Sequence, residues 1–344
     1  QAIEHHFEET YYAQLSNWCE AHNIALTGHP AEPDATRHLR YFQMPAQDIV
    51  WRYIEPDRPS ALEGRQSTQA KAASSVMLHS QGRRNANEFC GAYGHDFTFE
   101  EMEWLANWLL VRGCNLLIPH AFYYSLRGPR KDERPPDVGL NSPWWNTTFT
   151  GFASACRRLS WLNTDSQLIC HVAILGEHHN LPWRAAKACF QNQIDFNYLD
   201  IVDLAQCTIT DNRLHIANQA YQVLIVDSDL PSETQELLKT LDGQIEIIHW
   251  GHNSDSSIDQ LKSVLPSSPF RNIDAEGLRI RHIRKQGFDW FIIHNEEDTA
   301  IECQLEFDSN TYLLNAQSSE MTHFTGQLSL DGYEMCVIVH KELS

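Results

Sequence analysis

Helix-forming and strand-forming patterns alternate along the first 140 residues, and this alternation limits the folds that the chain can adopt. The clearest unit begins at Thr98, which has Glu101 three residues later, the pattern of a capping box at the start of a helix. Apolar residues at helical spacing follow as far as Gly113, and residues 114–120 form an apolar run of strand length. A helix that leads into a buried strand, several times over, predicts a parallel sheet or a (β/α) barrel, because parallel strands need crossover connections.

Other segments of this region repeat the same order. Phe7, Tyr11, Leu15 and Trp18 recur at helical spacing and predict a helix with one apolar face. The remaining segments are a strand at 23–29, an apolar run at 48–54, a helix at 70–78 and a strand end at 87–89. About four such units fit, which is half of an eight-fold barrel. We therefore expect residues 1–145 to be the C-terminal half of a (β/α)8 TIM barrel.

The pattern changes twice further along the chain. Residues 146–268 alternate strands with helices, including a helix at 233–241 that Ser232 is expected to cap, and predict a doubly wound α/β domain. This stretch has no Gly-x-Gly-x-x-Gly or Walker loop, so nucleotide binding is disfavoured. Residues 269–344 hold strand-length segments separated by turn signals such as Gln286-Gly287, and predict a small antiparallel β domain.

Charge and hydropathy exclude some classes of partner. The chain has 45 acidic against 26 basic residues, a formal net charge of −19. Nucleic acid and anionic membranes are therefore disfavoured as partners, whereas neutral, hydroxyl-rich ligands such as sugars are compatible with that charge. No apolar stretch is long enough to cross a bilayer, and we expect neither a membrane span nor a signal peptide.

The nine cysteines are scattered, odd in number and without a Cys-x-x-Cys pair, so neither a disulfide framework nor a zinc site is predicted from them. Most lie among apolar neighbours, where free buried thiols are expected. Reduced thiols indicate a cytoplasmic location, with the periplasm as an alternative. The adjacent pair His178-His179 follows an apolar strand; neighbouring side chains usually diverge, so we expect an exposed loop and no metal. No cofactor is predicted.

Catalytic groups of a (β/α) barrel project from the carboxyl ends of its strands, so polar residues that follow apolar runs are the candidates. Glu88 is the strongest, because Gly91 and Gly94 leave room for close approach of a ligand. Cleavage of a glycosidic bond needs two carboxyl groups, one to protonate the leaving oxygen and one to attack or to activate water. The alternative for Glu88 is an ordinary solvated or ion-paired carboxylate.

Five further residues are candidates for substrate binding. His29 and His120 each end a predicted strand and could bond sugar hydroxyls, although either could be structural. Asp48 lies in a third such position, and Tyr93 and Tyr123 could form a stacking wall, although aromatic residues more often belong to the core.

Four segments of the chain form recognisable motifs: LTGHP at 26–30, QDIVWR at 47–52, NEFCGAYG at 87–94, and RGCN with PHAFYYS at 112–125. Together they resemble a group of bacterial glycoside hydrolases, related to the α-L-rhamnosidase-like families and, more distantly, to barrel β-galactosidases. Weaker similarity continues through 141–145, 194–200 and 277–282, so the resemblance covers nearly the whole chain.

The resemblance implies a barrel, then a flavodoxin- or amidotransferase-like α/β domain, then a β-sandwich, with boundaries at 1–145, 146–268 and 269–344. Glu88 would follow the seventh barrel strand, where retaining relatives carry the nucleophile, and could be acid or base in inverting relatives. His29 would follow the fifth strand and His120 the eighth. The partner carboxylate usually comes from the fourth strand, before this chain begins; Asp48, Glu55 and Glu100 are substitutes.

These observations favour a glycoside hydrolase that acts on an oligosaccharide or glycoside, with this chain a fragment of a larger enzyme. The barrel would be completed by an N-terminal part of the same protein or through a homo-oligomer. The alternative is a non-catalytic carbohydrate-binding or oligomerisation remnant. A nucleotide or amidotransferase-like enzyme in the α/β stretch is less favoured, because no Cys–His–Glu pattern with an elbow is evident there.

Overall fold

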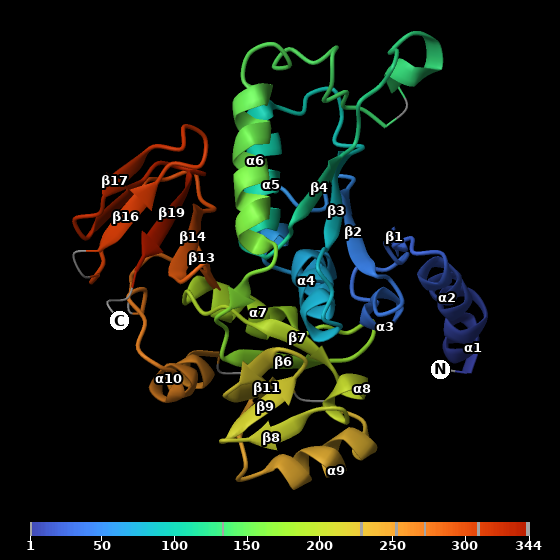
Figure 1. Cartoon of the computed structure of the whole chain (residues 1–344), viewed down its shortest axis with the longest axis vertical. Coiled ribbons are helices and arrows are strands. Elements are labelled where there is room, and N and C mark those ends of the chain that lie inside the picture. The colour runs from blue at the N-terminus through green and yellow to red at the C-terminus, as the bar shows by residue number, and fades with distance from the viewer. Residues whose placement is uncertain are drawn as a thin grey trace.

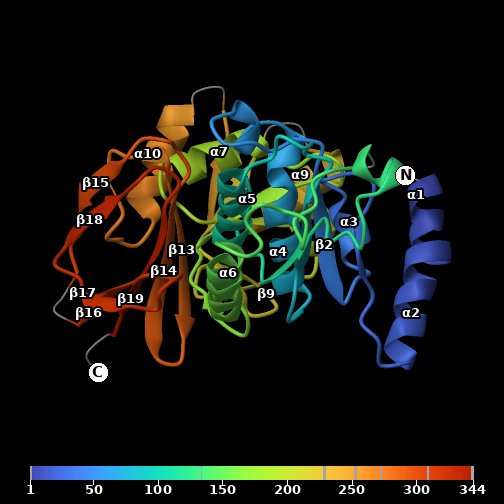
Figure 2. The same ribbon diagram turned by 90° about the horizontal axis from the view of Figure 1, so that it is seen from above.

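The computed structural model describes residues 2–132, 134–227, 230–251, 254–271, 273–307 and 310–341. The chain is a mixed α/β structure with several sheets. The N-terminal helices lie at one end of the molecule and the C-terminal strands at the other, in both views (Figures 1 and 2). In the described part of the chain, none of the helices is both long and apolar enough to span a membrane.

The first sheet is parallel, with strand order β1-β2-β3-β4. Its strands are β1 (Thr27–Gly28), β2 (Met44–Val50), β3 (Ala86–Gly91) and β4 (Leu116–Pro119). Four strands agree with the number of units expected from the sequence. Among the described residues they form an open sheet, and all their carboxyl ends meet at one edge.

Helices and a long loop surround this sheet. The helical segments are α1 (Ala2–Phe7), the π-helix η1 (Glu8–Tyr12), α2 (Ala13–Ala21), α3 (Thr36–Leu39), the 3-10 turns η2 (Pro59–Ala61), η3 (Arg65–Thr68) and η4 (Gly128–Asp132), α4 (Gln69–His79), α5 (Phe99–Val111) and α6 (Phe149–Asn163). The predicted capping box of α5 is confirmed, since the Thr98 hydroxyl accepts from the Glu101 amide and the Glu101 carboxylate accepts from the Thr98 amide.

The first helix of the chain differs from the expectation in one respect. Helical structure is confirmed across α1, η1 and α2. The apolar residues at helical spacing, however, remain exposed: Phe7, Tyr11, Leu15 and Trp18. The spacing therefore identified the helix but not a buried face, because no described part of the chain covers that side.

The second sheet is also parallel, with strand order β12-β11-β6-β7. Its strands are β6 (Val172–Gly176), β7 (Asn197–Asp200), β11 (Val223–Val226) and β12 (Glu246–His249), and its helices are α7 (Trp183–Gln191), α8 (Ile201–Leu204), α9 (Ser232–Leu241) and α10 (Ser254–Val264). A small antiparallel sheet of β8 (Thr208–Thr210), β9 (Arg213–Ile216) and β10 (Gln219–Tyr221) adjoins it in the chain. The prediction that Ser232 caps its helix is wrong: Ser232 is the first residue of α9, which follows Pro231 without a side-chain cap bond.

The third sheet is antiparallel, with strand order β17-β16-β19-β14-β13-β5. Its strands are β5 (Gln167–Leu168), β13 (Leu278–Lys285), β14 (Phe288–Asn295), β16 (Thr311–Leu314), β17 (Met321–His323) and β19 (Met335–His340); β15 (Ile301–Gln304) and β18 (Gln327–Leu330) form a separate pair. β5 comes from the middle of the chain and pairs with β13, so the C-terminal sheet includes one strand from the α/β stretch.

A buried ion-pair cluster joins the C-terminal sheet to the first sheet's helices. Arg112, directly after α5, donates to Glu296 at 2.5 Å, and Arg279 on β13 donates to the same carboxylate at 2.8 Å. The Arg112 guanidinium also lies 4.1 Å from the ring centre of Trp108. Because two charges from separate elements share one buried carboxylate, the cluster fixes α5 against the C-terminal sheet.

Candidate active site at the carboxyl ends of the parallel strands

Two carboxylates occupy the same register position on neighbouring strands of the first sheet. Asp48 on β2 is paired in register with Glu88 on β3. Residues paired in register on adjacent parallel strands point to the same face of a sheet. One oxygen of each carboxylate and one ring nitrogen of His29 all lie within 4.8 Å of one another. The structure therefore brings together three of the residues that the sequence singled out.

Two histidines flank the carboxylates from the strands on either side. His29 directly follows β1, and its Nε2 lies 3.9 Å from Asp48 Oδ2. Its Nδ1 lies 3.1 Å from the Pro30 carbonyl oxygen, which favours a proton on Nδ1 and leaves Nε2 facing the carboxylate. His120 directly follows β4, and its backbone amide donates to Phe89 O at 2.8 Å.

The surroundings of Asp48 alter its protonation. Burial raises the pKa of Asp48, and the neighbouring charge of Glu88 raises it further, to about 6, although His29, His120 and Arg134 oppose the shift. Its Oδ1 is buried and has no hydrogen-bond partner among the described residues. Two carboxylates that share a site do not both ionise easily, so Asp48 keeps its proton to a higher pH than an ordinary aspartate does.

The two tyrosines predicted to bind substrate lie in different surroundings. Tyr93 is 2% exposed and donates its hydroxyl to the Ile54 carbonyl at 2.6 Å, so it lies in the core and not at the surface of the site. Tyr123 is half-buried, its ring stands edge-on to that of His120 at 6.2 Å, and its hydroxyl donates to the Arg134 carbonyl at 2.9 Å. Of the two, only Tyr123 adjoins the other candidates.

Two residues that were not among the predicted substrate-binding residues lie beside the carboxylates. Trp51 directly follows β2, is 54% exposed and has a positive φ of 59°. The Arg134 guanidinium lies 6.0 Å from its ring centre and is among the charges that act on Asp48. The position of Trp51 after a strand was a usable signal. Arg134 lies in a loop without periodicity, so its sequence position carried none.

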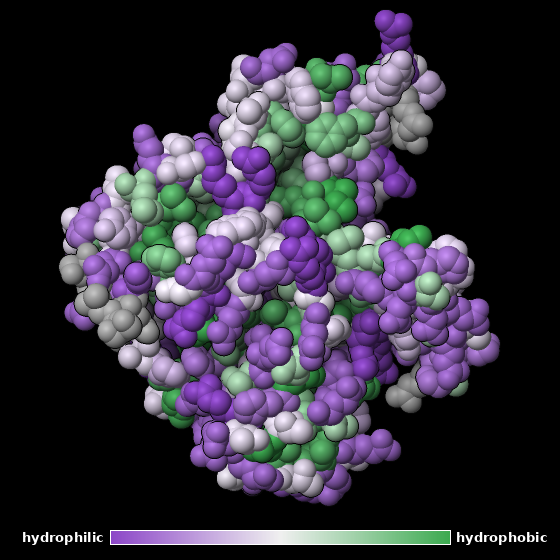
Figure 3. Space-filling view, in the orientation of Figure 1, coloured by the Kyte–Doolittle hydropathy of each residue, from purple (hydrophilic) through white to green (hydrophobic). Residues whose placement is uncertain are grey.

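The surface around the strand ends is hollowed and partly apolar. Figure 3 shows hydrophobic surface gathered in the hollow beneath the upper loops, which in Figure 1 lie above the carboxyl ends of β3 and β4. Exposed apolar side chains from β4 and the following segment are Ile118, Phe122, Tyr124 and Leu140. Exposed aromatic faces beside polar groups are suited to a sugar ring, which presents an apolar face and a rim of hydroxyls.

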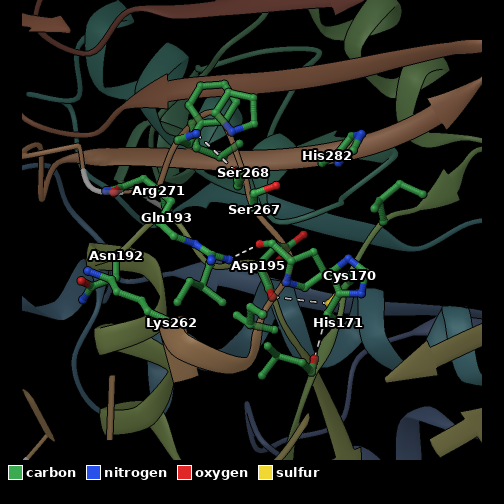
Figure 4. A pocket seen from close by; sticks show the side chains of 18 of the residues that line it. Cys170, His171, Asn192, Gln193, Asp195, Lys262, Ser267, Ser268, Arg271 and His282 are labelled. Carbon is green, nitrogen blue, oxygen red and sulfur yellow. Dashed lines mark hydrogen bonds between the residues drawn. The ribbon is translucent and has the colours of Figure 1, made fainter. Parts of the chain in front are cut away.

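A separate cavity of about 200 Å³ lies between the second sheet and the C-terminal sheet (Figure 4). Among the described residues its lining includes none of β1 to β4. Asp195, which faces it, is paired with Lys71 at 2.8 Å and Arg281 at 3.5 Å, and His282 is paired with Asp289 at 2.7 Å. Because these groups are already engaged, the cavity is a weaker candidate for catalysis than the Asp48–Glu88 pair.

The arrangement as a whole is a glycoside hydrolase-like fold, as the solved structures that superimpose on nearly the entire chain show. A rhamnosidase from Novosphingobium sp. PP1Y superimposes with a TM-score of 0.69 at 14% identity, over 97% of this chain and 38% of that chain. A catalytic mutant of a GH42 β-galactosidase from G. stearothermophilus gives 0.65 at 10% identity, over 94% of this chain and 65% of that one. The β-galactosidase of Rahnella sp. R3 gives 0.62 at 9% identity, over 96% and 67%.

The chain therefore spans 38% of the length of the rhamnosidase and 65% of the length of the G. stearothermophilus β-galactosidase mutant. No protein-family model matches the sequence, and no curated protein matches it. The similarity accordingly establishes the fold, and the chemistry of the site rests on its own residues.

Proposed function

We propose that this chain is part of a glycoside hydrolase and that Glu88 is its catalytic carboxylate. The observation that carries the proposal is the Asp48–Glu88 pair at one register position, with oxygens within 4.8 Å at the strand ends. Carboxylates about 5–5.5 Å apart are typical of retaining glycosidases, whereas inverting enzymes separate them by about 6.5–9.5 Å. The nearest oxygens of the pair lie within 4.8 Å of each other, closer to the first range than to the second, and we therefore propose retention.

The two carboxyl groups would divide the work according to their protonation. Glu88 attacks the anomeric carbon as an anion, and Asp48, which keeps its proton longer, protonates the leaving oxygen and later accepts a proton from water. His29 and His120 would form hydrogen bonds to sugar hydroxyls. Trp51 and Tyr123 would offer aromatic surface to the sugar ring, and Arg134 would orient polar groups of the ligand.

The proposed setting is a barrel that strands outside these 344 residues complete. The open parallel sheet and the 38% coverage of the rhamnosidase support this arrangement. We also propose the division into a barrel part at 1–145, an α/β domain at 146–268 and a β-sandwich at 269–344. The pairing of β5 with β13 means that the last two parts share a sheet.

Replacement of Asp48 by asparagine in the whole enzyme tests the role of this pair. An amide cannot donate the proton, so we expect kcat/KM to fall by about 10²–10⁴ for glycosides with poor leaving groups. For aryl glycosides with very acidic leaving groups, which need no protonation, the loss should be much smaller. The measurement is the slope of log(kcat/KM) against leaving-group pKa for the wild type and D48N.

Equal losses across all leaving groups would contradict a proton-donating role for Asp48. In that case the acid would come from another strand, as the resemblance implies, and Asp48 would only position substrate.

A non-catalytic carbohydrate-binding protein is the second candidate, favoured by the exposed Trp51 beside Arg134 and by the open sheet. Calorimetric binding of sugars by the wild type, with no hydrolysis of any aryl glycoside, would support this candidate against the first.

A further inference from the structure

Five side chains of types that can ligate a metal come together from three separate segments outside the Asp48–Glu88 pair. Glu4 lies on α1, Glu8 begins η1, His38 lies on α3, and His178 and His179 lie in the turn after β6. Figures 1 and 2 place α3 beside the N-terminal helices. Because Glu4 and Glu8 are far from the His178-His179 pair in the sequence, only the folded chain brings these side chains together.

The ligating atoms lie within coordination reach of one another. One oxygen of Glu8 and one ring nitrogen each of His38 and His178 all lie within 4.8 Å of one another, and Glu4, His178 and His179 form a second such set. His178 belongs to both sets. His179 Nε2 lies 3.1 Å from Glu4 Oε1.

Buried ring nitrogens in this cluster lack hydrogen-bond partners. His38 is 8% exposed, and its Nε2 has no partner among the described residues. Nε2 of His178 also has no hydrogen-bond partner among the described residues, and Nδ1 of His179 has none either, although Asp34 Oδ1 lies 3.8 Å from it. Buried polar atoms are normally satisfied, so several such nitrogens in one place indicate a missing ligand.

We propose that three or four of the side chains of Glu4, Glu8, His38, His178 and His179 together bind one divalent transition-metal ion such as zinc. Neutral imidazole and carboxylate are the nitrogen and oxygen ligands that zinc takes in proteins, in sets of three or four. The site is distinct from the proposed catalytic pair and does not depend on it.

The backbone explains how two adjacent histidines can serve one ion. His179 has a positive φ of 66°, in a tight turn closed by hydrogen bonds between Glu177 and Asn180. With this conformation the His178 and His179 ring centres lie 3.9 Å apart, where adjacent side chains ordinarily diverge. Both rings are half-buried, so the sequence-based expectation of an exposed loop is wrong.

Outer contacts position several of these ligands, as is usual around metal sites. The His179 amide donates to the Asp34 carbonyl at 3.0 Å, and the Asp34 carboxylate is held by Arg65 at 2.6 Å. The cluster is thus supported before any ion binds.

His178 has to adjust on binding. Its Nδ1 faces the Arg37 amide at a long 3.3 Å, which places the proton on Nε2. Binding through Nε2 therefore requires that the proton move to Nδ1 and this weak contact open.

Zinc content is the direct test. The protein is stripped with EDTA, incubated with excess ZnCl2, desalted and measured by inductively coupled plasma mass spectrometry. We expect the H38Q/H178Q double variant to retain one zinc fewer per chain than the wild type. Replacement of the exposed His249 on β12 by glutamine is the matched control, and H249Q should retain the wild-type amount.

Cobalt gives a readout that does not depend on the variants. Co²⁺ added to the stripped wild-type protein should produce the visible absorption of a nitrogen- and oxygen-ligated ion, and equimolar Zn²⁺ should remove it. Equal zinc in the wild type and the double variant, or no cobalt band in the wild type, would overturn the proposal.

Discussion

The pKa of a single carboxylate in this molecule depends on its burial and on the charges beside it. Asp48 and Glu88 are both carboxylates on one sheet, yet burial and the adjacent charge raise the pKa of Asp48 to about 6. Glu296 shows the opposite effect: burial alone would raise its pKa, but Arg112 and Arg279 lower the pKa to about 2. A raised pKa suits a proton donor, and a lowered one indicates an ion pair that stabilises the fold.

Glu296 is therefore expected to contribute to stability. Because E296Q leaves two buried guanidinium groups without their anion, we expect the free energy of unfolding to fall by about 3–5 kcal/mol in urea titrations at pH 7. The exposed Glu302 on β15 is the control, and E302Q should stay within about 0.5 kcal/mol of the wild type. A loss for E296Q no larger than that of E302Q would contradict the account.

The same pair predicts a pH dependence. The pKa of Glu296 is lower in the folded protein, so the unfolded chain binds the proton more tightly. The stabilisation is then present above about pH 4.5, the ordinary pKa range of a glutamate, and is lost as pH falls toward 2. The stability difference between the wild type and E296Q should shrink over that window.

Among the helices and strands, a helix end was predicted most reliably where two residues close in the sequence form the cap together. The Thr98–Glu101 pair fixed the start of α5, because both halves of the capping box are encoded within four residues. Ser232 had no such reciprocal partner in the structure, and its helix begins one residue earlier than expected. The apolar spacing from Phe7 to Trp18 found a helix but not its partner surface, which depends on tertiary contacts.

Thr98 and Ser232 provide a matched pair of tests. T98A removes the hydroxyl that accepts the Glu101 amide and should lower the free energy of unfolding by about 1 kcal/mol. S232A removes no side-chain cap bond and should change stability by less than about 0.5 kcal/mol. Equal losses in the two variants, measured by chemical denaturation, would contradict the assigned caps.

At the scale of the whole molecule, the sequence predicted the kinds of sheet better than the site that they assemble. The parallel strands near Glu88 and the antiparallel C-terminal strands follow from periodicity, which is local. The Asp48–Glu88 contact required a register that periodicity does not encode, although both residues were candidates. Arg134 and the cluster around His38 were missed, because loops and distant segments meet there only in three dimensions.

Hydrolysis by an E88Q variant of the whole enzyme tests the central claim most directly. The measurement is kcat/KM on the best substrate in a panel of aryl glycosides, with E302Q as the control because Glu302 lies exposed on β15. The account predicts a loss of at least about a thousand-fold for E88Q, since an amide neither attacks nor takes a proton, and near-wild-type activity for E302Q. Hydrolysis by folded E88Q within a few-fold of the wild type would contradict it.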